Sequence, residues 1–157
     1  MHNQIKALLD HPEFREGHFW RRIQVSSGDE IIRQGDFGSC FYLIESGHLR
    51  VLGHIDIGEN RQVTPGVCDL SAGEIVGEIV LFDTEPRSAT VQVVEDGTLI
   101  EIDGDKFMAF LESHTDIGFQ MFRSMMAIMV GRLRNNNDKI FSLLAWGLKA
   151  HQIEEEL

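Results

Sequence analysis

At 157 residues, with 43% hydrophobic and 25% charged side chains, the chain has the length and composition of one globular domain with a sizeable core. Its formal net charge of -11 argues against direct nucleic-acid binding, which requires a basic face. The first ten residues contain no secretory signal, and the longest apolar run has six residues, too short to cross a bilayer. We therefore expect a cytoplasmic protein without a membrane segment.

The first 19 residues predict a short amphipathic helix that ends before Pro12. Its apolar side is formed by Ile5, Leu8 and Leu9. From about Trp20 to Asp103, short apolar or alternating runs are separated by glycine-containing turns such as "QGDFGS", "ESGHL" and "EDGT". This spacing is typical of an antiparallel sandwich or barrel. The clearest strands are "FYLI" (41–44) and "TLIEI" (98–102).

Two helices are predicted after the strand region. Asp103 can cap the first of them. The inner face of this helix is formed by Phe107, Phe110 and Leu111. The second helix starts near Thr115 and Asp116 and runs almost to the end of the chain.

The later part of the second helix carries a heptad-like seam. One seam position is occupied by Met126, Leu133, Ile140 and Gly147, and the position three residues on by Met129, Asn136, Leu143 and Ala150. This pattern predicts a coiled coil with a second copy of the chain. The alternative is a helix that packs on its own sheet and is broken near residues 135–138.

Cys40 and Cys68 have no metal-ligand spacing and fall in strand-like segments, so we expect two buried free thiols. Of the seven histidines, His48 and His54 can share one strand. At about 3.3 Å per residue they are roughly 20 Å apart, too far for a metal pair. We therefore expect no metal site. With no Gly-x-Ser-x-Gly motif or Cys/His pairing, we also expect no enzyme.

Residues 76–93, V-G-E-I-V-L-F-D-T-E-P-R-S-A-T-V-Q-V, carry the clearest chemical signal. Gly77 enters a short helical turn, where glycine permits close approach and exposed N–H groups attract an anion. Arg87 supplies a permanent planar charge that suits a phosphate, and Ser88 a hydroxyl donor. Glu78 repels a phosphate but suits a sugar hydroxyl, so the set describes a ribose phosphate. The alternative is that Glu78 and Arg87 pair with each other.

This segment resembles the phosphate-binding cassette of cyclic nucleotide-binding domains, in which G-E and, several residues later, R-[ST]-A recur. A second motif, "IIRQGDFGSCFYLIESG" (31–47), resembles that family's pattern of two aliphatics, G-D, a small residue and four apolar residues before a closing glycine. The resemblance covers roughly residues 14–140. In texture it is closest to the sensor half of bacterial regulators of the catabolite activator type.

The resemblance implies a fold that is mainly β with α, an antiparallel β-roll (a double-stranded β-helix or jelly roll) flanked by an N-terminal helix and a long C-terminal helix. It implies one domain over residues 1–157. The roll core would occupy about residues 14–114, and residues 115–157 would form a helical lid and dimerisation segment. Only 18 residues follow Lys139, which leaves no room for the helix-turn-helix that such regulators append.

The family motif also implies roles for individual residues. Glu78 would accept a hydrogen bond from the ribose 2'-hydroxyl. Arg87 and Ser88 would hold the cyclic phosphate, together with the backbone at Gly77, Ile79, Val80, Leu81 and Ala89. The sequence departs from the family at Val80, where a small residue is usual. A branched side chain there loosens binding if it points at the phosphate and is harmless if it faces the core.

Contacts with the base are implied for four further residues. Val67 and Leu70 would form part of an apolar wall, and Asn136 and Asn137 fall where the long helix of these regulators contacts the base. Asn136 has an alternative role, because one polar residue in an apolar seam can fix register and oligomeric state. Ser88 goes with cyclic GMP in eukaryotic relatives and with cyclic AMP in bacterial regulators. The bacterial-type helix favours cyclic AMP here.

The function implied is a non-catalytic cyclic nucleotide receptor that signals through movement of its C-terminal helix to an unidentified downstream protein. Two alternatives remain. One is a degenerate domain of the same fold that acts as a nucleotide-free interaction module. The other is the sensor part of a transcription regulator whose DNA-binding part is absent.

Overall fold

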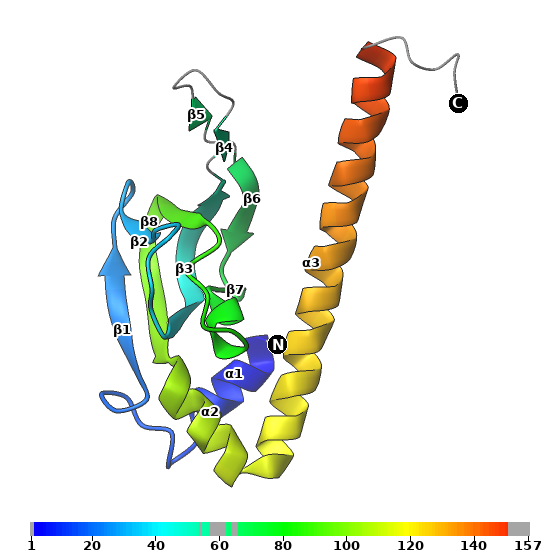
Figure 1. Ribbon diagram of the computed structural model, residues 1–157. Helices are drawn as coiled ribbons and strands as arrows, with labels where there is room; N and C mark the ends of the chain where they lie inside the picture. The colour runs from blue at the N-terminus through cyan, green and yellow to red at the C-terminus, as the bar shows by residue number, and fades with distance from the viewer. Residues whose placement is uncertain (1, 54, 57–61, 64–65, 151–157) are drawn as a thin grey trace. The chain divides into compact units, whose positions relative to one another are not determined.

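The computed structural model describes residues 2–53, 55–56, 62–63 and 66–150. Its elements are α1 (His2–Leu9), β1 (Trp20–Val25), β2 (Glu30–Ile32), β3 (Cys40–Leu52), β4 (Ile55–Asp56), β5 (Gln62–Val63), β6 (Gly66–Ser71), β7 (Ile75–Val76), the 3-10 turn η1 (Glu78–Leu81), β8 (Thr90–Asp103), α2 (Gly104–Ser113) and α3 (Thr115–Ala150) (Figure 1). They form two compact units, Met1–Gly118 and Phe119–Leu157, here called the roll unit and the helical unit. Within the described ranges, no helix combines the length and apolar character needed to span a membrane.

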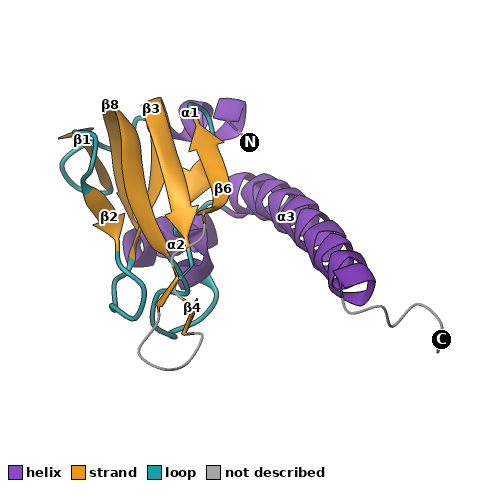
Figure 2. Cartoon of the chain, turned by 90° about the horizontal axis from the view of Figure 1, so that it is seen from above, coloured by secondary structure: helices purple, strands orange, loops and turns teal. Residues whose placement is uncertain are grey.

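The roll unit is built on an antiparallel sheet with the strand order β1-β8-β3-β6, to which β2 is added at β8 and β7 at β3. The long strands β3 and β8 lie side by side, and their pairing runs from Cys40 opposite Asp103 to Leu52 opposite Thr90 (Figure 2). The helix α1 precedes this sheet in the chain, and α2 and α3 follow it. This architecture confirms the antiparallel β-roll, with its N-terminal and long C-terminal helices, expected from the sequence.

Two of the predicted turns lie inside strands. "ESGHL" is part of β3 and "EDGT" part of β8, where the register shifts between Ile44 and Leu49. Gly47 has a φ of 93°, and a Cβ on Gly97 would lie 2.1 Å from the carbonyl oxygen of Ser46. The prediction of turns at these two sites was wrong because a bulge uses glycine for the same reason as a turn, namely access to conformations that other residues avoid.

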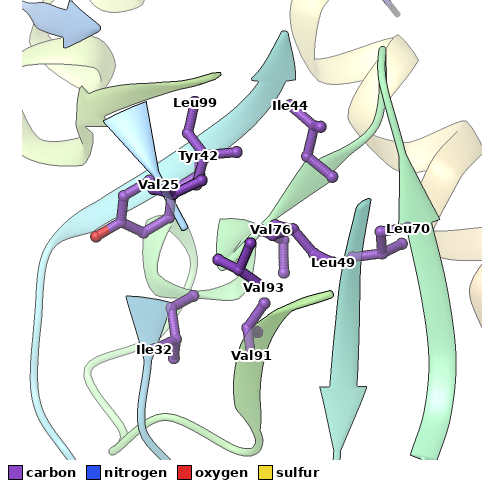
Figure 3. Packing of buried hydrophobic residues seen from close by; sticks show 10 residues of the cluster. All are labelled: Val25, Ile32, Tyr42, Ile44, Leu49, Leu70, Val76, Val91, Val93 and Leu99. Atoms are coloured by element: carbon purple, nitrogen blue, oxygen red, sulfur yellow. The ribbon is translucent and has the colours of Figure 1, made fainter. Parts of the chain in front are cut away.

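Apolar side chains from several strands fill the inside of the roll (Figure 3). Alternation along β8 buries Val91 and Val93 and leaves Gln92 between them half-buried. The core cluster consists of Val25, Ile32, Tyr42, Ile44, Leu49, Leu70, Val76, Val91, Val93 and Leu99. Because Ile32 ends β2 and Val76 ends β7, the core anchors the two segments that lead into the motifs singled out above.

The helix α2 has the N-cap and the buried inner face that the sequence predicted. Asp103 is its N-cap, and the carboxylate accepts the Lys106 backbone N–H at 3.1 Å. Phe107 and Phe110 are buried, with 0% and 4% exposure. Phe14, from the segment after α1, packs against both rings, at 5.1 Å between its centroid and that of Phe110. The N-terminal segment and α2 therefore share one aromatic core.

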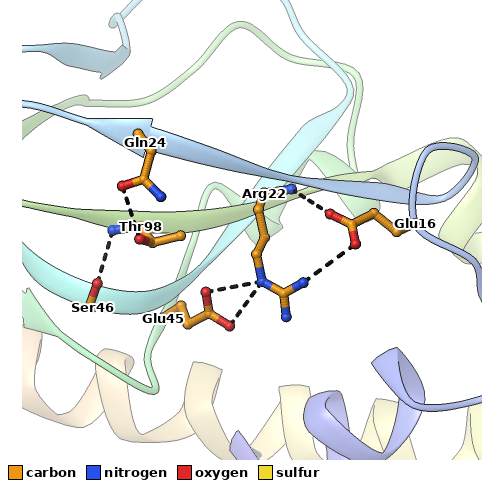
Figure 4. A network of polar contacts seen from close by, with 6 residues as sticks. All are labelled: Glu16, Arg22, Gln24, Glu45, Ser46 and Thr98. Atoms are coloured by element: carbon orange, nitrogen blue, oxygen red, sulfur yellow. Dashed lines mark hydrogen bonds and ion pairs between the residues drawn. The ribbon is translucent and has the colours of Figure 1, made fainter.

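Polar side chains connect β1, β8 and β3 on an exposed face (Figure 4). Arg22 donates from Nε to Glu45 at 3.1 Å and from Nη1 to Glu16 at 3.4 Å. The backbone N–H of Thr98 donates to the hydroxyl of Ser46 at 3.1 Å. Exposed ion pairs stabilise little, so this network adds to the definition of strand register more than to the free energy of unfolding.

Cys40 is half-buried and Cys68 is exposed, and both are free thiols. The expectation of two buried thiols was therefore wrong for Cys68. Alternation puts Cys68 on the same face of β6 as the buried Leu70, but residues 66–69 of this strand are all exposed, so the core does not extend to Cys68. Among the described residues, no group of three or more histidines, cysteines or carboxylates is arranged to hold a metal ion.

Candidate functional site

Gly77 connects β7 to η1, the short helical turn that the sequence predicted. β7 pairs with β3, with Val76 opposite Tyr42, so the entry of the turn is fixed to the sheet. Gly77 has φ 79° and ψ 11°, in the left-handed region that favours glycine. A Cβ there would lie 2.7 Å from Cδ1 of Ile32 and 2.9 Å from Nη1 of Arg87. Both the backbone and the neighbouring side chains therefore require glycine.

Arg87 joins three segments of the roll. Its backbone N–H donates to the carbonyl of Asp36 at 2.8 Å, and its carbonyl accepts from the N–H of Gly35 at 2.9 Å. Its guanidinium donates to the carbonyl of Gly77 at 2.9 Å and to that of Cys40. A guanidinium carries five N–H donors in a planar fork. Arg87 can therefore keep both bonds and still bind an anion.

Glu78 is the first residue of η1, and its side chain is buried, with 2% exposure. A carboxylate buried this deeply requires interaction partners. Glu78 has such an interaction within the protein. The sequence left open whether Arg87 pairs with Glu78. Because the carbonyls of Gly77 and Cys40 orient the guanidinium, Arg87 does not need that pairing to be held in place.

The remaining cassette residues differ in exposure. Ser88 is exposed and Ala89 half-buried, directly before β8 begins. On η1, Ile79 is 45% exposed, whereas Val80 and Leu81 are half-buried. The branched side chain of Val80 is thus outside the fully buried core. η1 is one turn long, and the N–H groups at the start of a helical turn have no partner within that turn.

Three supporting groups escaped the sequence analysis. The Thr90 hydroxyl, 1% exposed, accepts the backbone N–H of Gln34 at 3.0 Å and so ties the β2–β3 connection to β8. Gly38 lies so close to Arg87 that a Cβ would be 3.3 Å from Nη2. The carbonyl of Cys40 holds the same guanidinium. Thr90 follows the R-S-A motif directly and could have been found there, but a carbonyl has no signal in residue type.

The predicted base-contacting residues fall in both units. Val67 and Leu70 are three apart on β6, and strand alternation puts them on opposite faces: Leu70 is in the core at 4% exposure and Val67 is 41% exposed. Asn136 and Asn137 are exposed residues of α3 in the helical unit. Base contact stays a prediction for all four residues. Of the residues predicted to bind the phosphate, the structure brings Gly77 and Arg87 into direct contact.

A second group of polar side chains surrounds the start of β3. Tyr42 donates its hydroxyl to Glu101 at 3.3 Å, and Arg21 pairs with the same carboxylate. Burial, followed by the charge of Glu101, raises the pKa of Tyr42 to about 12. Burial, followed by Glu101 and Asp103, also raises the pKa of the Cys40 thiol. Cys40 therefore stays a neutral thiol at neutral pH, and its part in the site is its carbonyl.

The family model described as "Cyclic nucleotide-binding domain" matches residues 22–114, which include the whole cassette and the β2–β3 connection. The chain belongs to the cyclic nucleotide-binding domain family. This membership agrees with the resemblance carried by the two sequence motifs and with the observed roll.

Known relatives include eukaryotic and bacterial proteins. The chain is 33% identical over 103 residues to a "cAMP-dependent protein kinase regulatory subunit" of Blastocladiella emersonii, covering 66% of this chain and 25% of that protein. It is 33% identical over 94 residues to the "Cyclic AMP receptor protein" of Thermus thermophilus, covering 60% of this chain and 41% of that protein. The solved "Thermus thermophilus Catabolite Activator Protein" matches with a TM-score of 0.66 and 25% identity, over 90% of this chain and 59% of that one. The chain thus spans only part of each relative's length.

Proposed function

We propose that the chain is a non-catalytic receptor for a cyclic nucleotide, with cAMP preferred to cGMP. In this proposal, the ribose 2'-hydroxyl donates to Glu78, and the guanidinium of Arg87 binds the cyclic phosphate. Further phosphate contacts would come from the Ser88 hydroxyl and from the backbone N–H groups of Ile79, Val80, Leu81 and Ala89. The roll would bind and orient the nucleotide without breaking any bond in it.

The observation that carries the proposal is the convergence of three segments on Arg87. The carbonyls of Gly77 and Cys40 hold the guanidinium, while its backbone is bonded to the connection that contains Asp36. A permanent charge is thereby fixed beside η1, whose first residue is the buried Glu78. Fixed donors that need no rearrangement bind an anion with less entropic cost than mobile ones.

The preference for cAMP is supported by the kinase regulatory subunit and the receptor protein described above, because both are named for that nucleotide. Ser88, exposed beside Arg87, is the residue that favours cGMP as the alternative, because a hydroxyl can also meet the amino group of guanine. Titration of the wild-type protein with each nucleotide in turn shows which of the two binds with the higher affinity.

Signalling is proposed to run through α3 and a second copy of the chain. Three seam residues of the helical unit, Met126, Leu133 and Leu143, are 62–67% exposed, and pairing with an identical helix would bury them. Nucleotide can shift such a helix only if its affinity differs between two helix arrangements. A downstream protein would then read the arrangement of the dimer.

Calorimetric titration of the wild type and of Arg87→Ala with cAMP and cGMP tests the binding proposal. Loss of a charge-assisted phosphate contact costs about 1.5–3 kcal/mol, so Arg87→Ala is expected to bind roughly tenfold to over a hundredfold more weakly. Arg22→Ala is the matched control, because Arg22 forms exposed ion pairs with Glu16 and Glu45 away from the cassette. It is expected to bind like the wild type.

The titration also separates the rival functions. Absence of binding by the wild type would overturn the receptor proposal and favour the nucleotide-free interaction module. Equal affinity of the wild type and Arg87→Ala would show that Arg87 does not hold the phosphate. Tighter binding of cGMP than of cAMP would reverse the proposed preference and leave the site in place.

A further inference from the structure

The β2–β3 connection, residues 33–39, meets Arg87 at three points, although all of its residues are exposed. The carbonyl of Asp36 accepts the backbone N–H of Arg87 at 2.8 Å, and the N–H of Gly35 donates to the carbonyl of Arg87 at 2.9 Å. Gly38 lies against the guanidinium, where a Cβ would be 3.3 Å from Nη2. A displacement of the connection therefore moves both the backbone and the guanidinium of Arg87.

Thr90 anchors this exposed connection to the sheet. It begins β8 and is the first buried residue after Arg87. Its hydroxyl, with the residue 1% exposed, accepts the backbone N–H of Gln34 at 3.0 Å. Thr90 is paired with Leu52 of β3, so its position is fixed by the two long strands of the roll.

The bonds made by Thr90 and Arg87 close a ring. The chain runs from Arg87 to Thr90, the hydroxyl of Thr90 bonds to Gln34, the chain runs on to Asp36, and its carbonyl bonds back to Arg87. A group that is held in place before its ligand arrives binds with less entropic cost than a mobile one. The hydroxyl of Thr90 is the side-chain member of this ring, and therefore the member that a substitution can remove.

A purely structural role for the hydroxyl leads to a different expectation. Gln34 is exposed, so its N–H can bond to water when the hydroxyl is absent. Valine at position 90 would keep the branching at Cβ that suits a strand. If the hydroxyl only satisfied this N–H, its loss would leave the affinity for nucleotide unchanged.

We propose that Thr90 is a positioning residue of the nucleotide site. Without contacting the nucleotide, its hydroxyl fixes the β2–β3 connection and, through it, the guanidinium of Arg87. The inference rests on the proposed function, because that function assigns the cyclic phosphate to Arg87. It also separates two neighbouring hydroxyls: the exposed Ser88 would bind the phosphate directly, whereas the buried Thr90 acts through Arg87.

Calorimetric titration of the full chain with cAMP tests this role. Thr90→Val is expected to bind about threefold to tenfold more weakly, the range that one neutral hydrogen bond supplies. Thr90→Ala lacks the same hydroxyl and should show the same loss, while Thr90→Ser keeps the hydroxyl and should bind like the wild type. Thr98→Val is the matched control in the same strand, because the hydroxyl of Thr98 donates to Gln24 at 3.2 Å. It should also bind like the wild type.

A double-mutant cycle with Arg87→Ala shows whether the effect of Thr90 passes through the guanidinium. In the Arg87→Ala background, Thr90→Val is expected to lower the affinity by less than about twofold, because the group that it positions is gone. A structural effect that is independent of Arg87 would lower the affinity by the same factor in both backgrounds. Circular dichroism and urea unfolding establish that each variant is folded at the temperature of the titration.

The outcomes separate this inference from the proposed function. Wild-type affinity in folded Thr90→Val or Thr90→Ala would overturn the positioning role and leave the receptor proposal in place. Equal losses in the two backgrounds of the cycle, or a loss in Thr90→Ser as large as that in Thr90→Val, would overturn it as well. Absence of cAMP binding by the wild type would overturn the receptor proposal and, with it, the role of Thr90.

Discussion

At Gly77, two separate requirements coincide. The backbone has a φ of 79°, and the guanidinium of Arg87 lies where a side chain would begin. Gly28 has the first requirement without the second, because its φ is 96° but a Cβ there would meet nothing within 4 Å. The two glycines therefore distinguish the cost of backbone strain from the cost of displacing Arg87.

We expect Gly77→Ala to lower the free energy of unfolding. The loss should exceed the roughly 1–2 kcal/mol that the left-handed conformation costs an alanine. We also expect its affinity for cyclic nucleotide to fall about tenfold, or roughly 1.4 kcal/mol, because the new methyl group displaces Arg87. Urea unfolding and calorimetric titration measure the two effects. Gly28→Ala should show the conformational cost alone and bind like the wild type. Wild-type affinity in Gly77→Ala would mean that the position of Arg87 beside Gly77 is not needed for binding.

The candidate site residues that could be predicted from sequence are those whose residue type alone indicates a chemical role. Arg87 is a permanent cation, Glu78 an acceptor, and Gly77 a residue that tolerates unusual backbone. The carbonyl of Cys40 could not be predicted, because every residue has a carbonyl and only the folded strand aims this one at Arg87. The proposed contacts with the base are harder still to predict from sequence, because Val67 and Asn136 lie in different units.

Among the elements, the pair β3 and β8 determines the architecture of the roll. The sequence predicted their clearest parts, because apolar alternation is strong in both. The sequence analysis placed a turn at a glycine in each strand. In the structure, Gly47 and Gly97 instead lie at a β-bulge, where the register of the two strands shifts. Before that bulge, Tyr42 on β3 lies directly opposite Glu101 on β8 and donates to its carboxylate.

This cross-strand pair predicts how stability depends on pH. The pKa of Tyr42 in the folded protein is raised to about 12, from an ordinary value of 10.0. The unfolded chain therefore releases the proton first, and the contribution of Tyr42 to stability is complete below about pH 10 and lost as the pH rises toward 12. Because the chain has one tyrosine, the ultraviolet absorbance of the phenolate reports Tyr42 alone. Its midpoint should lie well above pH 10 in the folded protein and near 10 in urea.

Tyr42→Phe is the control for this titration. It keeps the ring in the core but removes the ionising group, so its free energy of unfolding should depend less on pH between 10 and 12 than that of the wild type. A phenolate midpoint near pH 10 while circular dichroism shows an intact fold would contradict the prediction, because the hydroxyl would then be as well hydrated as in the unfolded chain.

At the scale of the whole molecule, the two units carry one tryptophan each. Trp20 is buried in the roll unit, where its indole N–H donates to the carbonyl of Phe14 at 2.9 Å. Trp146 is 71% exposed on α3 in the helical unit. The heptad pattern predicted α3 and its apolar faces but not their partner, because the chain's own roll and a second copy would cover the same stripe. The fluorescence of Trp146 can therefore report whether nucleotide binding alters the helical unit.

We expect saturating cAMP to change the fluorescence of Trp146, because the proposed signal passes from the cassette to α3. Subtracting the response of Trp146→Phe from that of the wild type isolates this tryptophan and leaves Trp20 in the roll undisturbed. Trp146→Phe should bind cAMP like the wild type, since position 146 lies outside the roll unit. Arg87→Ala, at the same nucleotide concentration, should show a smaller change in proportion to its lost occupancy.

If calorimetry shows binding while the Trp146 signal stays constant, nucleotide occupies the roll without altering the helical unit. In that case signalling through α3 is wrong, and a partner would have to read the roll itself.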